Sequence, residues 1–268
     1  MTDWLIGLVG SLTISLLAYR KRSLSVSGAL AAVILGTLMY VFGSLAWFGT
    51  LIAFFISSSL LSSVKRKLKA AAESGYAKSG RRDAAQVAAN GGIGLLLCII
   101  NAVWPDPVWW AAYVGVMATV TSDTWATEIG GLSRSLPRSV ITGKQVAAGT
   151  SGGITWLGTG ASAVGGLFIG VMVWLFAHLD AVQLVPLLFI GMMAGLIGAL
   201  SDSWLGAILQ VMYRCSVCGK EVEKHTHCEA SCTRIRGAAW MTNDAVNAIS
   251  SLAGGAASIL FFYMFNIL

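Results

Sequence analysis

The cationic side chains of this chain are confined to four short segments between long apolar stretches. All 18 Lys and Arg residues fall within 20–22, 65–82, 134–144 and 214–236. Lys and Arg are enriched in the cytoplasmic loops of membrane proteins, so we expect all four segments to face the cytoplasm. Two membrane crossings must then separate each consecutive pair. The pattern predicts a polytopic helical bundle with every basic loop on one side.

Composition supports a membrane protein. The chain has 268 residues, of which 56% are hydrophobic and only 11% are charged, which is too apolar for an ordinary soluble domain. The net charge of +6 follows from the one-sided loops, so we expect no nucleic-acid binding; membrane lipids, anionic headgroups and nucleotides are the expected partners. The first apolar run, 4–19, follows Asp3 rather than basic residues, so we expect no cleavable signal peptide.

Runs of roughly 17 to 25 apolar residues can cross a bilayer as helices. We therefore predict an all-α fold, a single integral membrane domain over 1–268, with about eight transmembrane helices near 3–19, 26–43, 45–64, 88–104, 108–130, 154–178, 184–212 and 240–264. The connection near Gly43 is short enough to be a re-entrant turn instead. The breaks at 105–107 and 178–180 lack Lys and Arg, as external loops should. An even number of crossings places both termini outside.

Small residues recur at helical spacing in the last three spans, which predicts faces where backbones approach closely. These stripes comprise Gly158, Ala161, Gly165, Gly166 and Gly170; Gly191, Gly195, Gly198 and Gly206; and Asn243, Asn247, Ser251, Gly255 and Ser258. Helix packing accounts for the glycines. It does not account for the carboxylates beside them.

Four carboxylates lie inside or at the edges of the spans: Asp123, Glu128, Asp202 and Asp244. A charge there is costly unless it is paired, solvated or used in function. All four, with Asn90 and the hydroxyls of Thr124, Thr127 and Ser203, fall in the cytoplasmic half of the predicted bundle. Such oxygen ligands suit Mg²⁺, and we expect Asp123, Asp202 and Asp244 to bind it. The alternative is that these groups pair with Lys and Arg or hydrogen-bond helices together.

The loop 131–153 is rich in glycine and hydroxyl residues and ends directly before a helix. Backbone N–H groups of Gly149, Thr150, Ser151, Gly152 and Gly153 could bind a phosphate there. Arg138 and Lys144 would add positive charge. The order of residues is not that of a Walker motif. An ordinary loop with a helix cap is the alternative.

Four of the five cysteines lie in the loop 213–239. A cytoplasmic location argues against disulfides, and Cys-x2-Cys followed by further Cys and His residues is typical of a structural zinc site. The candidate ligands are Cys215, Cys218, His225, His227, Cys228 and Cys232. Free cysteines are the alternative. Cys98 lies in an apolar run and is interpreted as a core residue.

Several of these segments, in this order, resemble the phytyl phosphate kinase family, the transmembrane-protein-19-like group long classed as a domain of unknown function. The matching pieces are 122–130, 137–138, 142–144, 149–153, 202–207 with Gln210, the Cys-x2-Cys loop and 243–247. The resemblance implies a Mg²⁺-dependent kinase that converts an isoprenoid monophosphate into its diphosphate with CTP. It implies a catalytic role for Asp123, Glu128, Asp202 and Asp244, and substrate or nucleotide binding by Arg138, Lys144, Gly149, Thr150, Ser151, Gly152, Gly153, Asn243 and Asn247. Asn90, which lies at the same predicted depth as the acids, is a further candidate binding residue.

An ion-coupled transporter or flippase of a lipid phosphate or small anion is the competing interpretation, because membrane acids and glycine-rich helices also suit translocation. Two features disfavour it: the polar residues concentrate toward one face, and no inverted repeat is visible in the sequence. A purely structural membrane protein would leave the four acids unexplained. We expect the protein to reside in the plasma membrane.

Overall fold

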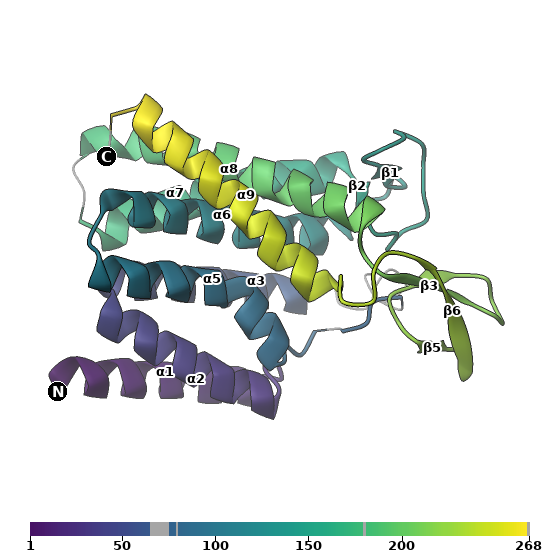
Figure 1. Cartoon of the computed structure of the whole chain (residues 1–268), viewed down its shortest axis with the longest axis horizontal. Coiled ribbons are helices and arrows are strands. Elements are labelled where there is room, and N and C mark those ends of the chain that lie inside the picture. Colours follow the sequence, from purple (N-terminus) through teal and green to yellow (C-terminus); the bar gives the residue numbers. More distant parts are fainter. Residues whose placement is uncertain (65–74, 79, 179–180, 267–268) are drawn as a thin grey trace.

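Eight long helices dominate the computed structural model, which describes residues 1–64, 75–78, 80–178 and 181–266. They are α1 (Thr2–Arg20), α2 (Val26–Phe42), α3 (Leu45–Ser63), α5 (Ala84–Val103), α6 (Pro107–Gly130), α7 (Trp156–Phe176), α8 (Ala181–Ile208) and α9 (Asn243–Met264). Figure 1 shows them running back and forth along one common direction. Each predicted span corresponds to one of these helices, and the predicted helical membrane fold is confirmed.

Not all eight helices are equally apolar. Six are long and apolar enough to cross a membrane, namely α1, α3, α5, α7, α9 and the part of α8 from Gln183 to Ile208. Helix α2 is apolar but has only 17 residues. Within the described part of the chain, helix α6 is not among the helices that are long and apolar enough to cross a membrane. Its last turns carry the polar residues Asp123, Thr124, Thr127 and Glu128. A helix surrounded by other helices does not need an apolar surface toward lipid, so about eight crossings remains an approximate number.

The two ends of the bundle differ in charge. The start of α1 and the end of α9 lie together at one end, and the loops that carry the strands lie at the other (Figure 1). The described members of all four cationic segments belong to loops or helix ends on this second side, here called the basic end. Lys65, Arg66, Lys67, Lys69 and Asp180, which the sequence analysis used for topology, lie outside the described residues.

The short connection at Gly43 and Ser44 joins two complete helices. Helix α3 begins at Leu45, at the end of the bundle opposite the basic end, and runs to Ser63. Near its last residue, the hydroxyl of Ser62 donates a hydrogen bond to Glu128 at the basic end of α6. The segment therefore traverses the bundle and is not a re-entrant turn.

Short strands order two loops at the basic end. Strand β1 (Arg138–Ser139) pairs antiparallel with β2 (Gly153–Ile154). Strands β3 (Met212–Cys215), β4 (Glu221–Val222), β5 (Thr226–His227) and β6 (Ala230–Arg236) form an antiparallel sheet in the order β4-β3-β6-β5. The sequence pattern predicts none of these strands, because β1, β2, β4 and β5 have only two residues each and the longer β6 has few apolar residues to mark a strand period.

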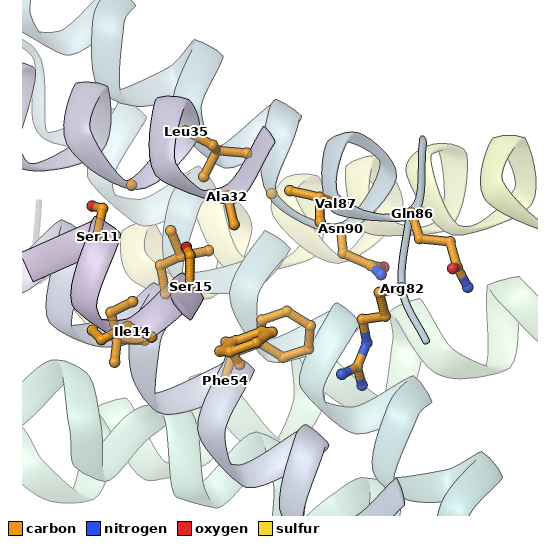
Figure 2. A pocket seen from close by; sticks show the side chains of 15 residues that line it. Ser11, Ile14, Ser15, Ala32, Leu35, Phe54, Arg82, Gln86, Val87 and Asn90 are labelled. Carbon is orange, nitrogen blue, oxygen red and sulfur yellow. The ribbon is translucent and has the colours of Figure 1, made fainter. Parts of the chain in front are cut away.

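Helices α1, α2, α3 and α5 enclose a small pocket of about 60 Å³ (Figure 2). Most of its lining is apolar or small, and the polar side chains of Arg82, Gln86 and Asn90 lie at one end. The remaining lining residues are Ser11, Ile14, Ser15, Ala32, Leu35, Gly36, Leu51, Ile52, Phe54, Phe55, Val87 and Gly91.

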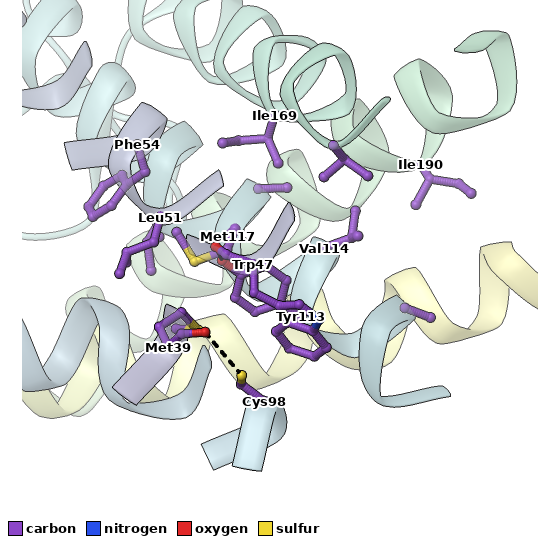
Figure 3. Close-up of a cluster of buried hydrophobic side chains, with 14 of the residues drawn as sticks. Met39, Trp47, Leu51, Phe54, Cys98, Tyr113, Val114, Met117, Ile169 and Ile190 are labelled. Atoms are coloured by element: carbon purple, nitrogen blue, oxygen red, sulfur yellow. Dashed lines mark hydrogen bonds between the residues drawn. The ribbon is translucent and has the colours of Figure 1, made fainter. Parts of the chain in front are cut away.

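The apolar core is built around α6, in which every residue from Ala111 to Ser122 is buried. Helices α3, α5, α7, α8 and α9 all contact it. Figure 3 shows Trp47, Tyr113 and Met117 at the centre of this cluster. Cys98 is fully buried there and its thiol donates to the Met39 carbonyl oxygen at 3.7 Å, which agrees with its interpretation as a core residue.

Glycines let the helices around α6 approach it closely. A Cβ atom at Gly195 would overlap the Ser122 hydroxyl, and one at Gly198 would overlap Thr119. Likewise, Gly166 of α7 and Gly191 of α8 each leave room for the carbonyl group of the other. The predicted packing role of the glycine stripes is confirmed. The same contacts set α6 against α8 one turn before Asp123 and Asp202.

Candidate functional site

A polar cavity of about 370 Å³ opens among the helices at the basic end. It is lined by parts of α3, α5, α6, α8 and α9, by the loop 149–153 and by the segment before α5. Of the residues predicted from sequence, the cavity brings together Asn90, Asp123, Thr124, Thr127, Glu128, Gly149, Thr150, Ser151, Gly152, Gly153, Asp202, Ser203, Asn243, Asp244 and Asn247. Residues far apart in the chain therefore share one site.

Asp123 and Asp202 form the acidic centre of this cavity. They project from α6 and α8, and their carboxylates are close enough to interact electrostatically. The Ser250 hydroxyl donates to Asp202 Oδ2 at 3.0 Å. The Asn247 amide, oriented as a donor, contacts the same oxygen at 3.0 Å. These bonds from α9 fix the Asp202 carboxylate in position, and its other oxygen accepts no hydrogen bond from the described residues.

The other two acids are engaged by neighbouring side chains. Asp244 forms an ion pair of 2.5 Å with Lys78, and Lys78 also contacts Asp83 at 2.9 Å. Glu128 accepts a hydrogen bond from Ser62. Both acids still line the cavity, but at positions where a cation or hydroxyl already compensates part of their charge.

The donor set fits Mg²⁺ bound by two carboxylates rather than three. Among the described residues, the acids do not form a group of three whose ligand oxygens all lie within 4.8 Å of one another. Mg²⁺ commonly takes one or two carboxylates and completes its shell with water and substrate phosphates. Asp123 and Asp202 provide the two carboxylates, and Thr124, Thr127 and Ser203 provide hydroxyls in the same cavity.

The glycine-rich loop is held against α8. Gly149 and Gly152 have positive φ angles of 83° and 80°, a conformation that favours glycine. A Cβ atom at Gly152 would lie 2.8 Å from the Ser203 carbonyl oxygen, and the Ser151 hydroxyl donates to Gln210 Oε1 at 2.9 Å. In the part of the chain that the structure describes, the N–H groups of Gly149, Ser151 and Gly152 donate no hydrogen bond. The loop thus offers free donors beside the acids.

A smaller pocket of about 150 Å³ adjoins the cavity and shares Asp123, Thr127 and Thr150 with it. Thr155, the N-cap of α7, is among its lining residues. The positive end of the α7 dipole therefore points toward the space between the loop and the acids, which favours an anion there.

The basic residues in the cavity are not those selected from sequence. Arg138 and Lys144 are exposed and line neither pocket; Arg138 donates to the Gly143 carbonyl oxygen of its own loop at 2.9 Å. Lys78 and Arg82 line the cavity instead. A sequence signal existed, because Arg82 directly precedes Asp83 and Lys78 lies five residues before it, and Asp83 is the N-cap of a helix whose first turns carry Gln86 and Asn90.

Arg82 is held where the cavity meets the apolar pocket. It donates to the Ser59 hydroxyl at 3.0 Å and lies 6.0 Å from the centre of the Phe55 ring. Burial lowers the pKa of its guanidinium and the charge of Glu128 acts in the opposite direction. Within the described residues it forms no ion pair.

Glu223, from the segment after β4, completes the cavity wall. Its Oε1 accepts from Gln210 at 2.7 Å and its Oε2 accepts from the Ala77 N–H at 3.0 Å. Burial raises the pKa of this carboxyl group. Sequence reasoning missed Glu223 because it lies in the loop that was interpreted only as a metal site.

The Cys/His loop brings four candidate ligands together. One ligand atom from each of Cys215, Cys218, His227 and Cys228 lies within 4.8 Å of the others, with His227 Nδ1 at 3.5 Å from Cys218 Sγ and 3.2 Å from Cys228 Sγ. Hydrogen bonds from the Cys218 N–H and from His227 lower the pKa of the Cys215 thiol to about 6. The arrangement suits a tetrahedral zinc ion.

Two further candidate ligands lie outside this group. His225 contacts the Tyr213 hydroxyl at 3.2 Å through Nε2. Cys232 pairs with Cys215 across β3 and β6, and its thiol is not part of the four-ligand group. The geometry therefore groups His227, rather than Cys232, with Cys215, Cys218 and Cys228.

Comparison with known proteins assigns the chain to a family. The family model described as integral membrane protein DUF92 matches residues 9–255, so the chain belongs to this family. Protein PGR of Arabidopsis thaliana is 32% identical over 256 residues, which cover 88% of this chain and 88% of the relative. An uncharacterised membrane protein of Methanocaldococcus jannaschii is 32% identical over 202 residues, covering 74% and 79% of the two chains. No solved structure matches.

Proposed function

We propose that this member of the DUF92 family is a Mg²⁺-dependent kinase that transfers a phosphoryl group from a nucleoside triphosphate, CTP by the family resemblance, to an isoprenoid monophosphate. The observation that carries the proposal is the composition of one cavity. It combines two membrane carboxylates, a glycine-rich loop with free N–H donors and two cations, Lys78 and Arg82. Phosphoryl transfer requires this combination of positioning and charge neutralisation.

The proposed reaction needs no strong base. An oxygen of the acceptor monophosphate is already ionised, so it forms the new bond to the γ-phosphorus directly. The bond between that phosphorus and the β,γ-bridging oxygen breaks, and the nucleoside diphosphate leaves with the electron pair. The product is the isoprenoid diphosphate. None of the residues in the cavity has to remove a proton.

Each part of the cavity has a role in this scheme. Asp123 and Asp202 would hold Mg²⁺, which neutralises charge on the triphosphate when bound. The loop 149–153 would bind phosphate oxygens through its N–H groups and the adjoining end of α7. Arg82 would bind the acceptor phosphate, while Lys78, paired with Asp244 and Asp83, would hold the cavity mouth in place.

The proposal includes an orientation. A nucleoside triphosphate is available in the cytoplasm, and the positive-inside rule places the basic end there. Both termini then lie outside, in agreement with their position at the opposite end of the bundle (Figure 1). The plasma membrane is the proposed location.

A structural zinc ion is a separate part of the proposal. Cys215, Cys218, His227 and Cys228 would bind it and hold together the small sheet β4-β3-β6-β5. Glu223 follows β4 directly and contacts Gln210, which in turn contacts Ser151 of the glycine-rich loop. The zinc ion would therefore stabilise one wall of the cavity without taking part in the reaction.

The decisive experiment is a transfer assay. Purified protein in lipid nanodiscs is incubated with each of the four γ-labelled nucleoside triphosphates and with prenyl alcohols or prenyl monophosphates, and labelled lipid is separated by thin-layer chromatography. We expect labelled diphosphate only with a monophosphate acceptor and Mg²⁺, and its loss in Asp202→Asn. If no phosphoryl group is transferred and the protein moves prenyl phosphate across proteoliposome membranes, the protein is a transporter and the kinase proposal is wrong.

A further inference from the structure

The apolar pocket of Figure 2 adjoins the polar cavity. Both are lined by Arg82, Gln86 and Asn90, and Figure 2 shows these side chains at one end of the pocket, with Ser11 and Ile14 toward the other. A polar chamber beside an apolar one matches a ligand with a charged head and a hydrocarbon tail.

The pocket extends from the basic end toward the middle of the membrane. Its lining on α2 runs from Ala32 to Gly36, whereas α2 begins at Val26 at the basic end. At about 1.5 Å per residue these positions lie roughly 9 to 15 Å along the helix. The hydrocarbon core of a bilayer is about 30 Å thick, so the pocket lies at the depth of a lipid tail.

Arg82 stands at the junction of the two chambers. One side of its guanidinium faces the Phe55 ring, and its hydrogen bond goes to a neutral hydroxyl, that of Ser59. The charge of Glu128 offsets part of the cost of burying this cation, but Arg82 forms no ion pair among the described residues, so an anion bound directly to it would be favourable. A phosphate at this junction would provide that anion and would direct its attached tail into the pocket.

We propose that the pocket between α1, α2, α3 and α5 binds the segment of the acceptor lipid's hydrocarbon tail nearest its phosphate, with the phosphate at Arg82. The inference rests on the proposed function for the identity of the headgroup. The inference adds two points to the proposed function. The lipid enters from the α1–α2 side of the bundle, and the space beside Ala32 determines which tail lengths are accepted.

The test fills the pocket and compares acceptors of different length. Ala32→Phe places a ring in the pocket, and Leu30→Phe, on the exposed face of the same helix, is the matched control. We expect Ala32→Phe to raise KM roughly tenfold or more for phytyl phosphate and to leave KM for dimethylallyl phosphate, whose tail does not reach Ala32, within about twofold. Leu30→Phe should change neither value.

A binding measurement separates this inference from the proposed reaction. A prenyl monophosphate with a photoreactive diazirine at its tail end should label α1 and α2 next to Ser15 and Ala32, and Ala32→Phe should abolish that labelling. Labelling without phosphoryl transfer would reject the kinase and keep the tail pocket. Transfer with Ala32→Phe indistinguishable from Leu30→Phe would reject the tail pocket and keep the kinase. Labelling that phosphatidylcholine displaces as well as prenyl phosphate does would assign the pocket to bulk lipid and overturn the inference.

Discussion

Lys78 and Asp244 form an ion pair of 2.5 Å although 166 residues separate them in the sequence. Lys78 also contacts Asp83, the N-cap of α5, so a single ammonium group joins the starts of α5 and α9 across the cavity mouth. Asp244 is thereby distinguished from Asp123 and Asp202. Its charge serves to hold two helices at a fixed separation.

A double-mutant cycle on this pair tests that distinction. Lys78→Met and Asp244→Asn should each lower turnover several-fold, because either change breaks the ion pair that joins the starts of α5 and α9 at the mouth of the cavity. The double variant should be no worse than the more damaged single variant, since both substitutions remove the same contact. The measurement is kcat and KM for the nucleotide in all four proteins. Fully additive losses would show that the two residues act separately.

Arg82 and Arg138 provide a matched pair of cations, one lining the cavity and the other outside it. Arg82→Gln should raise KM for the acceptor by about 10- to 100-fold, because a hydrogen bond to a charged group contributes about 1.5 to 3 kcal/mol. Arg138→Gln should change KM less than about twofold, since Arg138 is exposed and bonded within its own loop. Equal effects of the two substitutions would contradict the proposed place of the acceptor phosphate.

The positions of the helices could be predicted from sequence because a membrane span must be apolar over its whole length, and because Lys and Arg mark the loops on one side of the membrane. Depth along a helix could be predicted in the same way, and this is why Asp123, Asp202 and Asn90 were expected on one side and do share a cavity. Spacing of 3 or 4 residues between glycines also predicted the close packing of Gly195 and Gly198 on α6.

The pairing of polar residues could not be predicted, because it depends on how separate segments fold back on one another. Nothing in the sequence near Asp244 indicates that Lys78 neutralises it. Similarly, Glu223 reaches the cavity only because β4 pairs with β3 and places it beside Gln210. Arg138 and Lys144 were selected because they lie in the same loop as the glycines and carry positive charge, but both are exposed and do not line the cavity.

The zinc proposal predicts a defined difference among the cysteines. Wild-type protein should contain about one zinc per chain, as measured by elemental analysis. Cys218→Ser and Cys228→Ser should lose the metal and lower the melting temperature, because the ligands order the loop only when the ion is bound. Cys232→Ser, in the same sheet but outside the ligand group, should retain zinc. Loss of zinc in Cys232→Ser with retention in Cys228→Ser would contradict the ligand assignment.

The orientation proposal predicts where a fusion at the C-terminus functions. Alkaline phosphatase fused there should be active and green fluorescent protein dark, since α9 ends at the face opposite the basic loops. The same two reporters inserted after Thr142, in the exposed turn that follows β1, should behave in the opposite way. Fluorescence from the C-terminal fusion would show that the bundle has the opposite orientation. The cavity would then open on the outer face, where nucleoside triphosphates are scarce.

Asp123 and Asp202 should act as one unit. Asp123→Asn and Asp202→Asn should each lower kcat by about 100-fold or more, and the double variant should lose little beyond the worse single variant, because residues that bind the same group are not additive. Each single variant should also need a higher Mg²⁺ concentration for half-maximal turnover, a change that a structural role would not produce. Asp106→Asn is the matched control, since Asp106 caps the opposite end of α6, where it accepts from the Val108 N–H at 2.8 Å. That variant should lose some thermal stability but keep its Mg²⁺ dependence. If Asp123→Asn and Asp202→Asn both turn over prenyl phosphate at the wild-type rate and Mg²⁺ requirement, phosphoryl transfer does not occur between α6 and α8, and the cavity must serve the passage of an anion instead.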